Sequence, residues 1–103
     1  PTPAELPGSL AAKRTSHLIH LCHPLPLTKV EVRVDVDDAL PGFRIVSEVR
    51  THSVTGVEME ALTAVSVACL TLFDMLKAVD PAASIDDIRV LRKEGGKTGL
   101  WTR

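Results

Sequence analysis

Residues 55–81 read TGVEMEALTAVSVACLTLFDMLKAVDP, and this stretch decides the architecture of the chain. Thr55 and Glu58 have the spacing of a capping box, in which the two side chains satisfy backbone N–H groups at the start of a helix. Asp80 stands before Pro81, and a residue before proline avoids the helical region. The stretch therefore predicts a helix of about 24 residues, roughly 36 Å long at 1.5 Å per residue.

The apolar side chains of this helix spread over every direction instead of forming one stripe. A surface helix of a globular protein has a single apolar stripe. Because three short strands can cover only one side of the helix, a partner must cover the other. We predict a homo-oligomer with this helix at or near the interface, and its apolar residues are Val57, Leu62, Val65, Val67, Leu70, Leu72, Phe73, Met75, Leu76 and Val79.

Two strands precede the long helix. Residues 29–36 alternate strictly between valine and charged side chains, which is typical of a half-buried antiparallel strand. Residues 37–42 have turn chemistry, and residues 43–50 predict a partner strand with a less regular alternation. The side chains expected to face the core are Val30, Val32, Val34, Val36, Phe43, Ile45 and Val49.

The remaining elements complete the predicted order of helix, strand, strand, helix and strand. Ser9 is a candidate cap for a helix over residues 10–21, which Pro24 and Pro26 end. Residues 85–93 are the last strand candidate. This order predicts a single α+β domain in which helices cover a mostly antiparallel sheet.

Composition narrows the class of protein. The chain has 103 residues, which suits one domain. Its 12 Lys and Arg balance 13 Asp and Glu, whereas a general nucleic-acid binder would show a basic excess. Only three residues are aromatic, namely Phe43, Phe73 and Trp101, so few side chains are suited to base stacking. We expect no nucleic-acid partner.

Cysteine usage and hydropathy indicate the compartment. Cys22 and Cys69 do not make a disulfide framework, which favours a reducing compartment. The longest helical stretch free of ionisable side chains, residues 61–73, is shorter than the ~20 residues of a membrane span. We therefore expect a soluble, cytoplasmic protein that has no membrane partner.

Polar side chains interrupt the long helix at few places. At about 100° per residue, Glu60, Thr71 and Asp74 fall within roughly 60° of one another. Lys77 lies three residues after Asp74, a spacing that lets the two side chains meet. Burying charges is costly unless they are paired or solvated. The stripe therefore lines a cleft, forms a buried ion-pair network, or lies on a solvated edge.

Other candidate residues have structural explanations beside functional ones. Glu58 is explained by the capping box, whereas Glu60 lies outside it and is the better candidate for a polar site. His17, His20 and His23 could share one helix face and bind a metal. No carboxylate is close in sequence and Pro24 follows at once, so three partly solvated histidines are favoured and no metal is expected.

A glycine-rich loop follows the last predicted strand. Residues 95–98, GGKT, match only the end of a phosphate-binding P-loop, because the first glycine of that motif would fall on Leu91 and no helix follows. Lys93 and Lys97 could still hold a phosphate together with backbone N–H groups of the loop. The alternative is an exposed loop near the C-terminus.

Taken together, these motifs resemble one family. The sequence motifs of this family correspond to AAKRTS at residues 11–16, LCHPL at 21–25, GVEMEALT at 56–63, DMLKAV at 74–79 and GGKTG at 95–99. The chain is similar over nearly its whole length to the molybdenum cofactor biosynthesis protein C family, the cyclic pyranopterin monophosphate synthases.

The resemblance implies a fold and an activity. The family has a ferredoxin-like α+β fold and forms a hexamer, a trimer of dimers, with active sites at subunit interfaces. A radical S-adenosylmethionine enzyme, the GTP cyclase, first joins ribose C3′ to guanine C8 of GTP. The family rearranges this 3′,8-cyclised GTP into cyclic pyranopterin monophosphate and releases pyrophosphate. It needs no redox cofactor of its own.

The resemblance also implies roles for individual residues. The family's catalytic groups correspond to Asp74, Lys77 and Lys93. Its substrate-binding groups correspond to Leu21, Cys22, His23, Met59 and Glu60, with Glu58 beside them. Lys97, on the glycine loop, is a further candidate for binding the triphosphate, whose roughly four charges need cations.

The chain departs from the family pattern in several places. A Lys-Gly-Asp segment, which carries a catalytic lysine about 26 residues before the position of His23, lies just beyond Pro1. We expect residues 1–103 to be a single synthase domain that lacks the family's N-terminal segment. His20, Pro7 and Phe73 replace a usual proline, a helical residue and a usual tyrosine. These three replacements affect the expected local geometry more than the function. The missing lysine and the apolar long helix leave open a second hypothesis, a non-catalytic oligomerisation or regulatory module, and the histidine metal site is a third.

Overall fold

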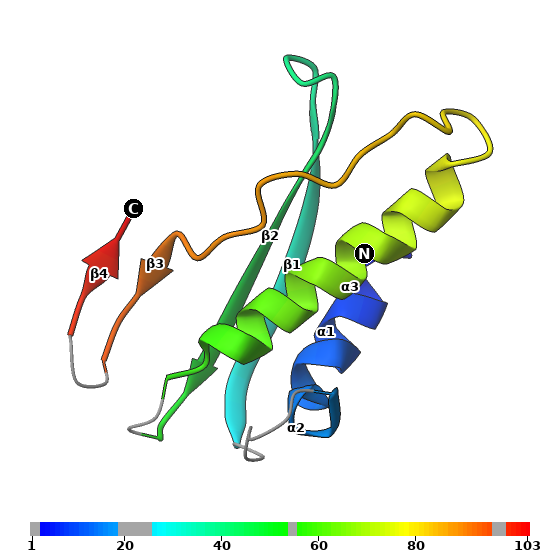
Figure 1. Ribbon diagram of the computed structural model, residues 1–103. Helices are drawn as coiled ribbons and strands as arrows, with labels where there is room; N and C mark the ends of the chain where they lie inside the picture. Colours follow the sequence, from blue (N-terminus) through cyan, green and yellow to red (C-terminus); the bar gives the residue numbers. More distant parts are fainter. Residues whose placement is uncertain (1–2, 19–25, 54–55, 96–98) are drawn as a thin grey trace.

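A long β-hairpin with two helices on one of its faces forms the body of the molecule (Figure 1). The computed structural model describes residues 3–18, 26–53, 56–95 and 99–103. Its elements are, in order, α1 (Glu5–Lys13), α2 (Thr15–Leu18), β1 (Leu27–Asp37), β2 (Gly42–Thr51), α3 (Glu58–Leu76), β3 (Arg92–Lys93) and β4 (Trp101–Thr102). The predicted α+β class is confirmed, and the arrangement is compatible with a ferredoxin-like fold.

The hairpin of β1 and β2 has the predicted antiparallel pairing. Val30, Val32 and Val34 lie opposite Val49, Ser47 and Ile45, and these side chains face the helices. Val32 is buried, but Val36 is 71% exposed and the prediction that it faces the core is wrong. Phe43, which lies opposite Val36, is also exposed, so its predicted place in the core is wrong as well. Both residues lie near the turn of the hairpin, which extends beyond the helices (Figure 1).

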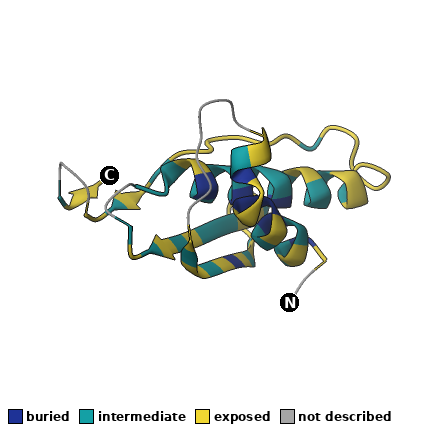
Figure 2. Ribbon diagram, turned by 90° about the horizontal axis from the view of Figure 1, so that it is seen from below, coloured by how far each residue is buried: buried dark blue, intermediate teal, exposed yellow. Residues whose placement is uncertain are grey.

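A close crossing of α1 and α3 forms the core. The buried residues gather where the two helices meet over the hairpin (Figure 2). Ala12, Ala64 and Ala68 are almost completely buried and contact Val32 of β1. A Cβ placed on Gly8 would lie 2.7 Å from the carbonyl oxygen of Ala64 and 3.1 Å from Cβ of Ala68. Gly8 therefore sets how closely α1 approaches α3.

The first helix begins earlier and ends earlier than predicted. We expected a helix over residues 10–21, but α1 spans Glu5–Lys13, and α2 follows from Thr15. Pro7 lies in the first turn of α1, where backbone N–H groups have no partner within the helix, so proline is tolerated there. The packing of Gly8 against Ala64 favours helix at a position where propensity alone opposes it.

The long helix is shorter than predicted at both ends. α3 begins at Glu58, and its N-cap is Val57, which makes no side-chain capping hydrogen bond. Glu58 is thus the first helical residue, and the prediction that it completes a capping box is wrong. The helix ends at Leu76, and residues 77–79 continue only as a turn. The helix therefore ends a few residues before Asp80, where the sequence predicted its end.

Among the described residues, α3 is long and apolar enough to cross a membrane when judged by length and composition alone. The core helix of a folded domain meets the same description. Here Ala64 and Ala68 are buried against α1 and the hairpin. Core packing thus explains part of the apolar character of α3. Leu70 and Met75 remain exposed, and they need a different explanation.

The last predicted strand is mostly not a strand. We expected residues 85–93, but only Arg92 and Lys93 form β3, which pairs with Trp101 and Thr102 of β4. Asp87 has a φ of 61°, in the left-handed region that interrupts an extended strand. The described residues contain two separate two-stranded sheets, β1–β2 and β3–β4, instead of one three-stranded sheet.

The Gly8 contact yields a test of the core. We predict that Gly8→Ala lowers the free energy of unfolding by about 1–3 kcal/mol, because the new methyl group overlaps a backbone carbonyl that cannot move freely. Ser9→Ala, on the next residue of the same helix, is the control and should change stability little. Urea unfolding at one fixed protein concentration measures both, and equal stabilities for the two variants would contradict the packing described.

Candidate active site

Glu58 and Lys93 form an ion pair between the first turn of α3 and β3. Lys93 Nζ lies 3.1 Å from Glu58 Oε1, and the two side chains are 30% and 35% exposed. The pair joins two segments that are 35 residues apart in the sequence, so it fixes the end of β3 against the helix. Lys93 is thereby held two residues before Gly95, whose φ of +79° begins the glycine loop.

One oxygen of Glu58 is shielded from solvent. Among the residues that the structure describes, none forms a hydrogen bond with Glu58 Oε1, although the Lys93 ammonium lies next to it. The contact is therefore a charge pair without a well-aligned hydrogen bond. A shielded carboxylate oxygen can accept further hydrogen bonds, and the neighbouring ammonium has three N–H donors. Together they can bind a polar group of a ligand.

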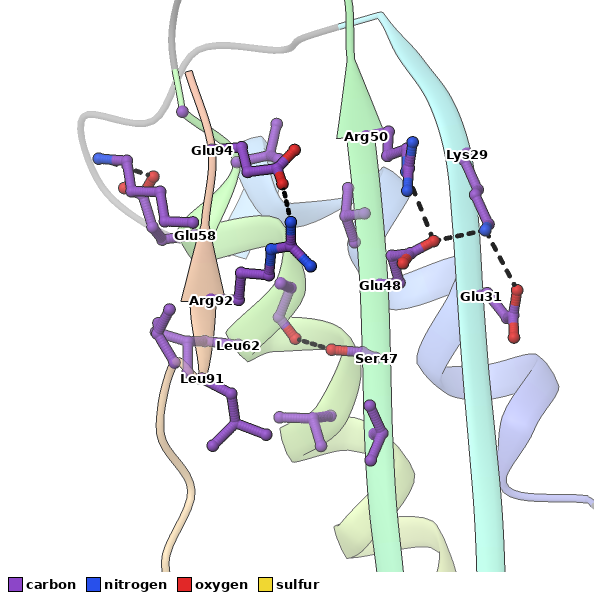
Figure 3. Close-up of a pocket in the computed structure, with 18 of the residues that line it drawn as sticks. Lys29, Glu31, Ser47, Glu48, Arg50, Glu58, Leu62, Leu91, Arg92 and Glu94 are labelled. Atoms are coloured by element: carbon purple, nitrogen blue, oxygen red, sulfur yellow. Dashed lines mark hydrogen bonds and ion pairs between the residues drawn. The ribbon is translucent and has the colours of Figure 1, made fainter. Parts of the chain in front are cut away.

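These two residues line a pocket. The pocket has a volume of about 760 Å³ and lies between β2, the first half of α3 and residues 89–95 (Figure 3). Ala61, Leu62 and Val65 of α3 give it an apolar side. Ser47 Oγ donates a hydrogen bond of 2.7 Å to the carbonyl of Ala61 and so ties β2 to the helix.

The pocket also contains a charged pair that the sequence analysis missed. Arg92 and Glu94 lie one residue to either side of Lys93, and their side chains form an ion pair at the pocket (Figure 3). Two residues separated by one position on an extended segment point the same way. That spacing, next to the predicted Lys93, is the signal that could have identified them.

Glu60 is buried in a different direction. Its side chain is only 5% exposed, and within the described part of the chain no hydrogen bond or ion pair reaches its carboxylate. Ala64 and Ala68, one and two turns further on, face α1, so Glu60 belongs to the side of α3 that faces α1 and α2. Burying a carboxylate requires a donor or a cation. Glu60 thus lies on the side of α3 that packs against the other helices, and it is not among the residues that line the pocket.

Asp74 and Lys77 meet at the other end of α3, as their spacing predicted. Lys77 Nζ lies 2.8 Å from Asp74 Oδ1, and the side chains are 57% and 73% exposed. The hydrogen bond and charge of Lys77 hold the pKa of Asp74 below its usual value. Asp74 is therefore ionised at neutral pH. Lowering the pH below this depressed pKa would protonate Asp74 and remove the interaction.

The polar stripe predicted along α3 is not a single cluster. Glu60 is buried, Asp74 is exposed, and Thr71 donates its hydroxyl to the carbonyl of Val67 within the helix. Glu58 and Asp74 are 16 residues apart, which is about 24 Å along a helix. Within one copy of the chain, the Glu58–Lys93 pair and the Asp74–Lys77 pair therefore cannot contact the same small molecule.

The remaining predicted residues are either outside the described part of the chain or exposed. Leu21, Cys22, His23 and Lys97 lie outside the described residues, as does His20. Met59, next to Glu58, is exposed. His17 lies in α2 and is exposed. Residues 3–18, 26–53, 56–95 and 99–103 contain no group of three side chains suited to holding a metal ion.

Comparison with known proteins identifies the class. The model of the MoaC family matches residues 2–96, which is nearly the whole chain. The chain therefore belongs to the MoaC family.

Curated relatives share much of the sequence. Over 98 residues the chain is 60% identical to a protein of Methylobacterium nodulans, 62% to one of Methylobacterium sp. (strain 4-46) and 59% to one of Cereibacter sphaeroides. Each is named cyclic pyranopterin monophosphate synthase. The match covers 95% of this chain but only 61–62% of each relative, so the chain spans about three fifths of their length.

The Glu58–Lys93 pair can be tested by a double-mutant cycle. We predict a coupling of about 1 kcal/mol between Glu58→Gln and Lys93→Met, because the two charges are partly shielded and lie in direct contact. The exposed Arg92–Glu94 pair provides the matched control. Its side chains are 63% and 59% exposed, and its coupling should fall in the range of about 0–0.5 kcal/mol. Unfolding free energies give both values, and equal couplings would show that the Glu58–Lys93 contact has no special role.

Proposed function

We propose that this chain is the main part of a cyclic pyranopterin monophosphate synthase, a lyase of molybdenum cofactor biosynthesis. Its substrate is 3′,8-cyclised GTP, and its products are cyclic pyranopterin monophosphate and pyrophosphate. The observation that carries the proposal is the identity of about 60% to synthases over 95% of the chain. The candidate residues Glu58, Met59 and Glu60 and the pair Asp74 and Lys77 all lie within that part of the chain.

The negative charge of the proposed substrate gives Lys93 and Lys97 a role in the site. Three linked phosphates carry about four negative charges, and charge-assisted hydrogen bonds from ammonium groups are the strong contacts that they accept. Lys93 is 30% exposed, it lines the pocket, and its ion pair with Glu58 holds it there. We assign Lys93, together with Lys97, to the phosphates. Pyrophosphate release then requires that these cations stabilise the charge on the departing group.

The rearrangement also moves protons. Ring opening, pterin formation and closure of the cyclic phosphate each transfer protons, and a positioned acid or base typically contributes 10²–10⁴-fold to such a step. Asp74 is ionised at neutral pH, and a carboxylate in this form can accept a proton. Its contact with Lys77 lowers its pKa and so makes it a weaker base, which means that the pKa shift is not the ground for this role. We assign Asp74 and Lys77 to proton transfer because they correspond to the family's catalytic groups and lie in direct contact.

An oligomer would bring the two ends of α3 together. The Asp74–Lys77 pair and the Glu58–Lys93 pair are about 24 Å apart along one helix, so a shared site needs α3 of a second copy. Leu70, Met75 and Val79, near Asp74, are exposed in a single chain. Exposed apolar side chains of this size beside a charged pair fit a subunit interface. We propose a hexamer built as a trimer of dimers, with substrate bound between copies.

The proposed reaction requires another enzyme that supplies its substrate. Its substrate must come from a radical S-adenosylmethionine GTP cyclase, because joining C3′ to C8 of GTP requires breaking an unactivated C–H bond. We place Leu21, Cys22, His23, Met59 and Glu60 at the substrate and the enzyme in the cytoplasm. The reaction transfers no net electrons between substrate and products, so the proposal includes no redox cofactor.

Activity of the full-length protein tests the assignment. We predict that Asp74→Ala lowers pyrophosphate release from 3′,8-cyclised GTP by about 10²-fold or more, because the proton acceptor is lost. Asp38→Ala is the matched control, since Asp38 is an exposed aspartate in the hairpin turn, and it should leave turnover unchanged.

Two other results would contradict the proposal. Normal turnover by Asp74→Ala would remove the catalytic role of Asp74. Absence of pyrophosphate release from the wild-type full-length protein, with its assembly intact, would favour the oligomerisation module instead.

A further inference from the structure

The hairpin of β3 and β4 gathers several side chains on the face that carries Lys93. Lys93 lies opposite Trp101. The backbone N–H of Arg103 donates a 2.8 Å hydrogen bond to the carbonyl of Leu91, so the ladder continues by one pair. Residues directly opposite one another share a face of a sheet, and so do alternate residues along a strand. One face of the hairpin therefore carries Leu91, Lys93, Trp101 and Arg103.

This face is also the one that meets α3. Lys93 reaches Glu58 in the first turn of α3, and Figure 3 shows Glu58 and the side chain of Arg92 on opposite sides of β3. In an antiparallel ladder, Trp101 is the direct neighbour of Lys93, and Arg103 is its diagonal neighbour at roughly 7–8 Å. Long side chains at this separation can contact the same ligand.

Several contacts hold the side chain of Arg103 in one orientation. Its Nε–H donates a 3.0 Å hydrogen bond to the carbonyl of Val90. Its guanidinium lies over the ring of Trp101, with Cζ 5.2 Å from the ring centroid, and the ring face attracts a cation in that position. Within the described residues, no hydrogen bond or ion pair uses the two terminal nitrogens of Arg103. The outer edge of the guanidinium is therefore oriented and open.

The two cations on this face differ in their charge balance. Glu58 offsets the charge of Lys93, whereas no side-chain carboxylate pairs with Arg103 in the part of the chain that the structure describes. Two terminal nitrogens of a guanidinium can donate parallel hydrogen bonds to two oxygens of one phosphate. Arg103 therefore offers the uncompensated charge and the geometry that a phosphate group requires.

We propose that Arg103 binds the substrate phosphates that leave as pyrophosphate, together with Lys93, and that Trp101 is a positioning residue for its guanidinium. The inference rests on the proposed synthase function and adds a binding residue to it. This part of the substrate needs positive charge and no proton transfer, which fits a face where cations lie apart from the Asp74–Lys77 pair. Neither Trp101 nor Arg103 lines the pocket, so the phosphates would lie along the hairpin beside it.

Pyrophosphate binding to the full-length protein, measured by titration calorimetry, tests the role of Arg103 without turnover. Arg103→Gln should weaken binding about 10–100-fold, because charge-assisted hydrogen bonds are lost. Arg103→Lys keeps the charge without the planar fork and should recover only part of the affinity. Arg44→Gln is the matched control and should bind like the wild type, because Arg44 is exposed and pairs with Asp37 near the turn between β1 and β2.

The same titration tests the positioning role of Trp101. Trp101→Leu should weaken pyrophosphate binding about 2–5-fold, because the attraction between the ring and the guanidinium is lost. Trp101→Phe keeps an aromatic face and should bind within about twofold of the wild type. In the Arg103→Gln background, Trp101→Leu should have no further effect, because Trp101 acts through Arg103.

Three outcomes would overturn the proposal. Unchanged pyrophosphate affinity in Arg103→Gln would remove Arg103 from the site, and so would undetectable binding by the wild type. Equal losses from Trp101→Leu with and without Arg103 would show that Trp101 does not act through Arg103.

Turnover of 3′,8-cyclised GTP by the wild type is measured separately and tests the synthase function. If the wild type has no turnover but binds pyrophosphate through Arg103, the synthase function fails and the phosphate site stands. Normal turnover with pyrophosphate binding that does not depend on Arg103 has the opposite meaning.

Discussion

The rest of the structure depends on the close approach of α1 to α3. Gly8 allows it, because any side chain at this position would overlap the Ala64 carbonyl and the Ala68 methyl group. The alanines on the facing side let α3 lie directly over Val32 of the hairpin. With one face of α3 fixed in this way, the directions of all its other side chains follow from the helical repeat.

That constraint separates the polar groups of α3 into two sites. Glu58 reaches the pocket and meets Lys93, whereas Asp74 and Lys77 meet each other on the exposed opposite end. Glu60 turns toward α1 and α2 and is buried. A family member that uses all of these residues on one substrate must combine the ends of two helices. The exposed Leu70, Met75 and Val79 beside Asp74 are consistent with such an arrangement.

Regular patterns made the secondary structure partly predictable. The strict valine alternation predicted β1, and the spacing of Asp74 and Lys77 predicted their ion pair. The bounds of α1 were missed because packing at Gly8 outweighs its low helix propensity. The start of α3 was missed because the helix begins only at Glu58, whose side chain meets Lys93 instead of capping the helix. The contact between Glu58 and Lys93 joins distant segments, so no local pattern could predict it. Glu58 and Lys93 were assigned to the active site through the resemblance to the family.

Complementation between two inactive variants tests the central claim most directly, namely that one site uses both ends of α3 from different copies. Full-length Asp74→Ala and Lys93→Ala proteins, carrying different tags, would be co-expressed and purified as mixed assemblies. In a two-copy site, half of the pairs are mixed and each mixed pair has one intact site, so the account predicts about one quarter of wild-type pyrophosphate release. Mixed assemblies that remain as inactive as either variant alone would contradict it.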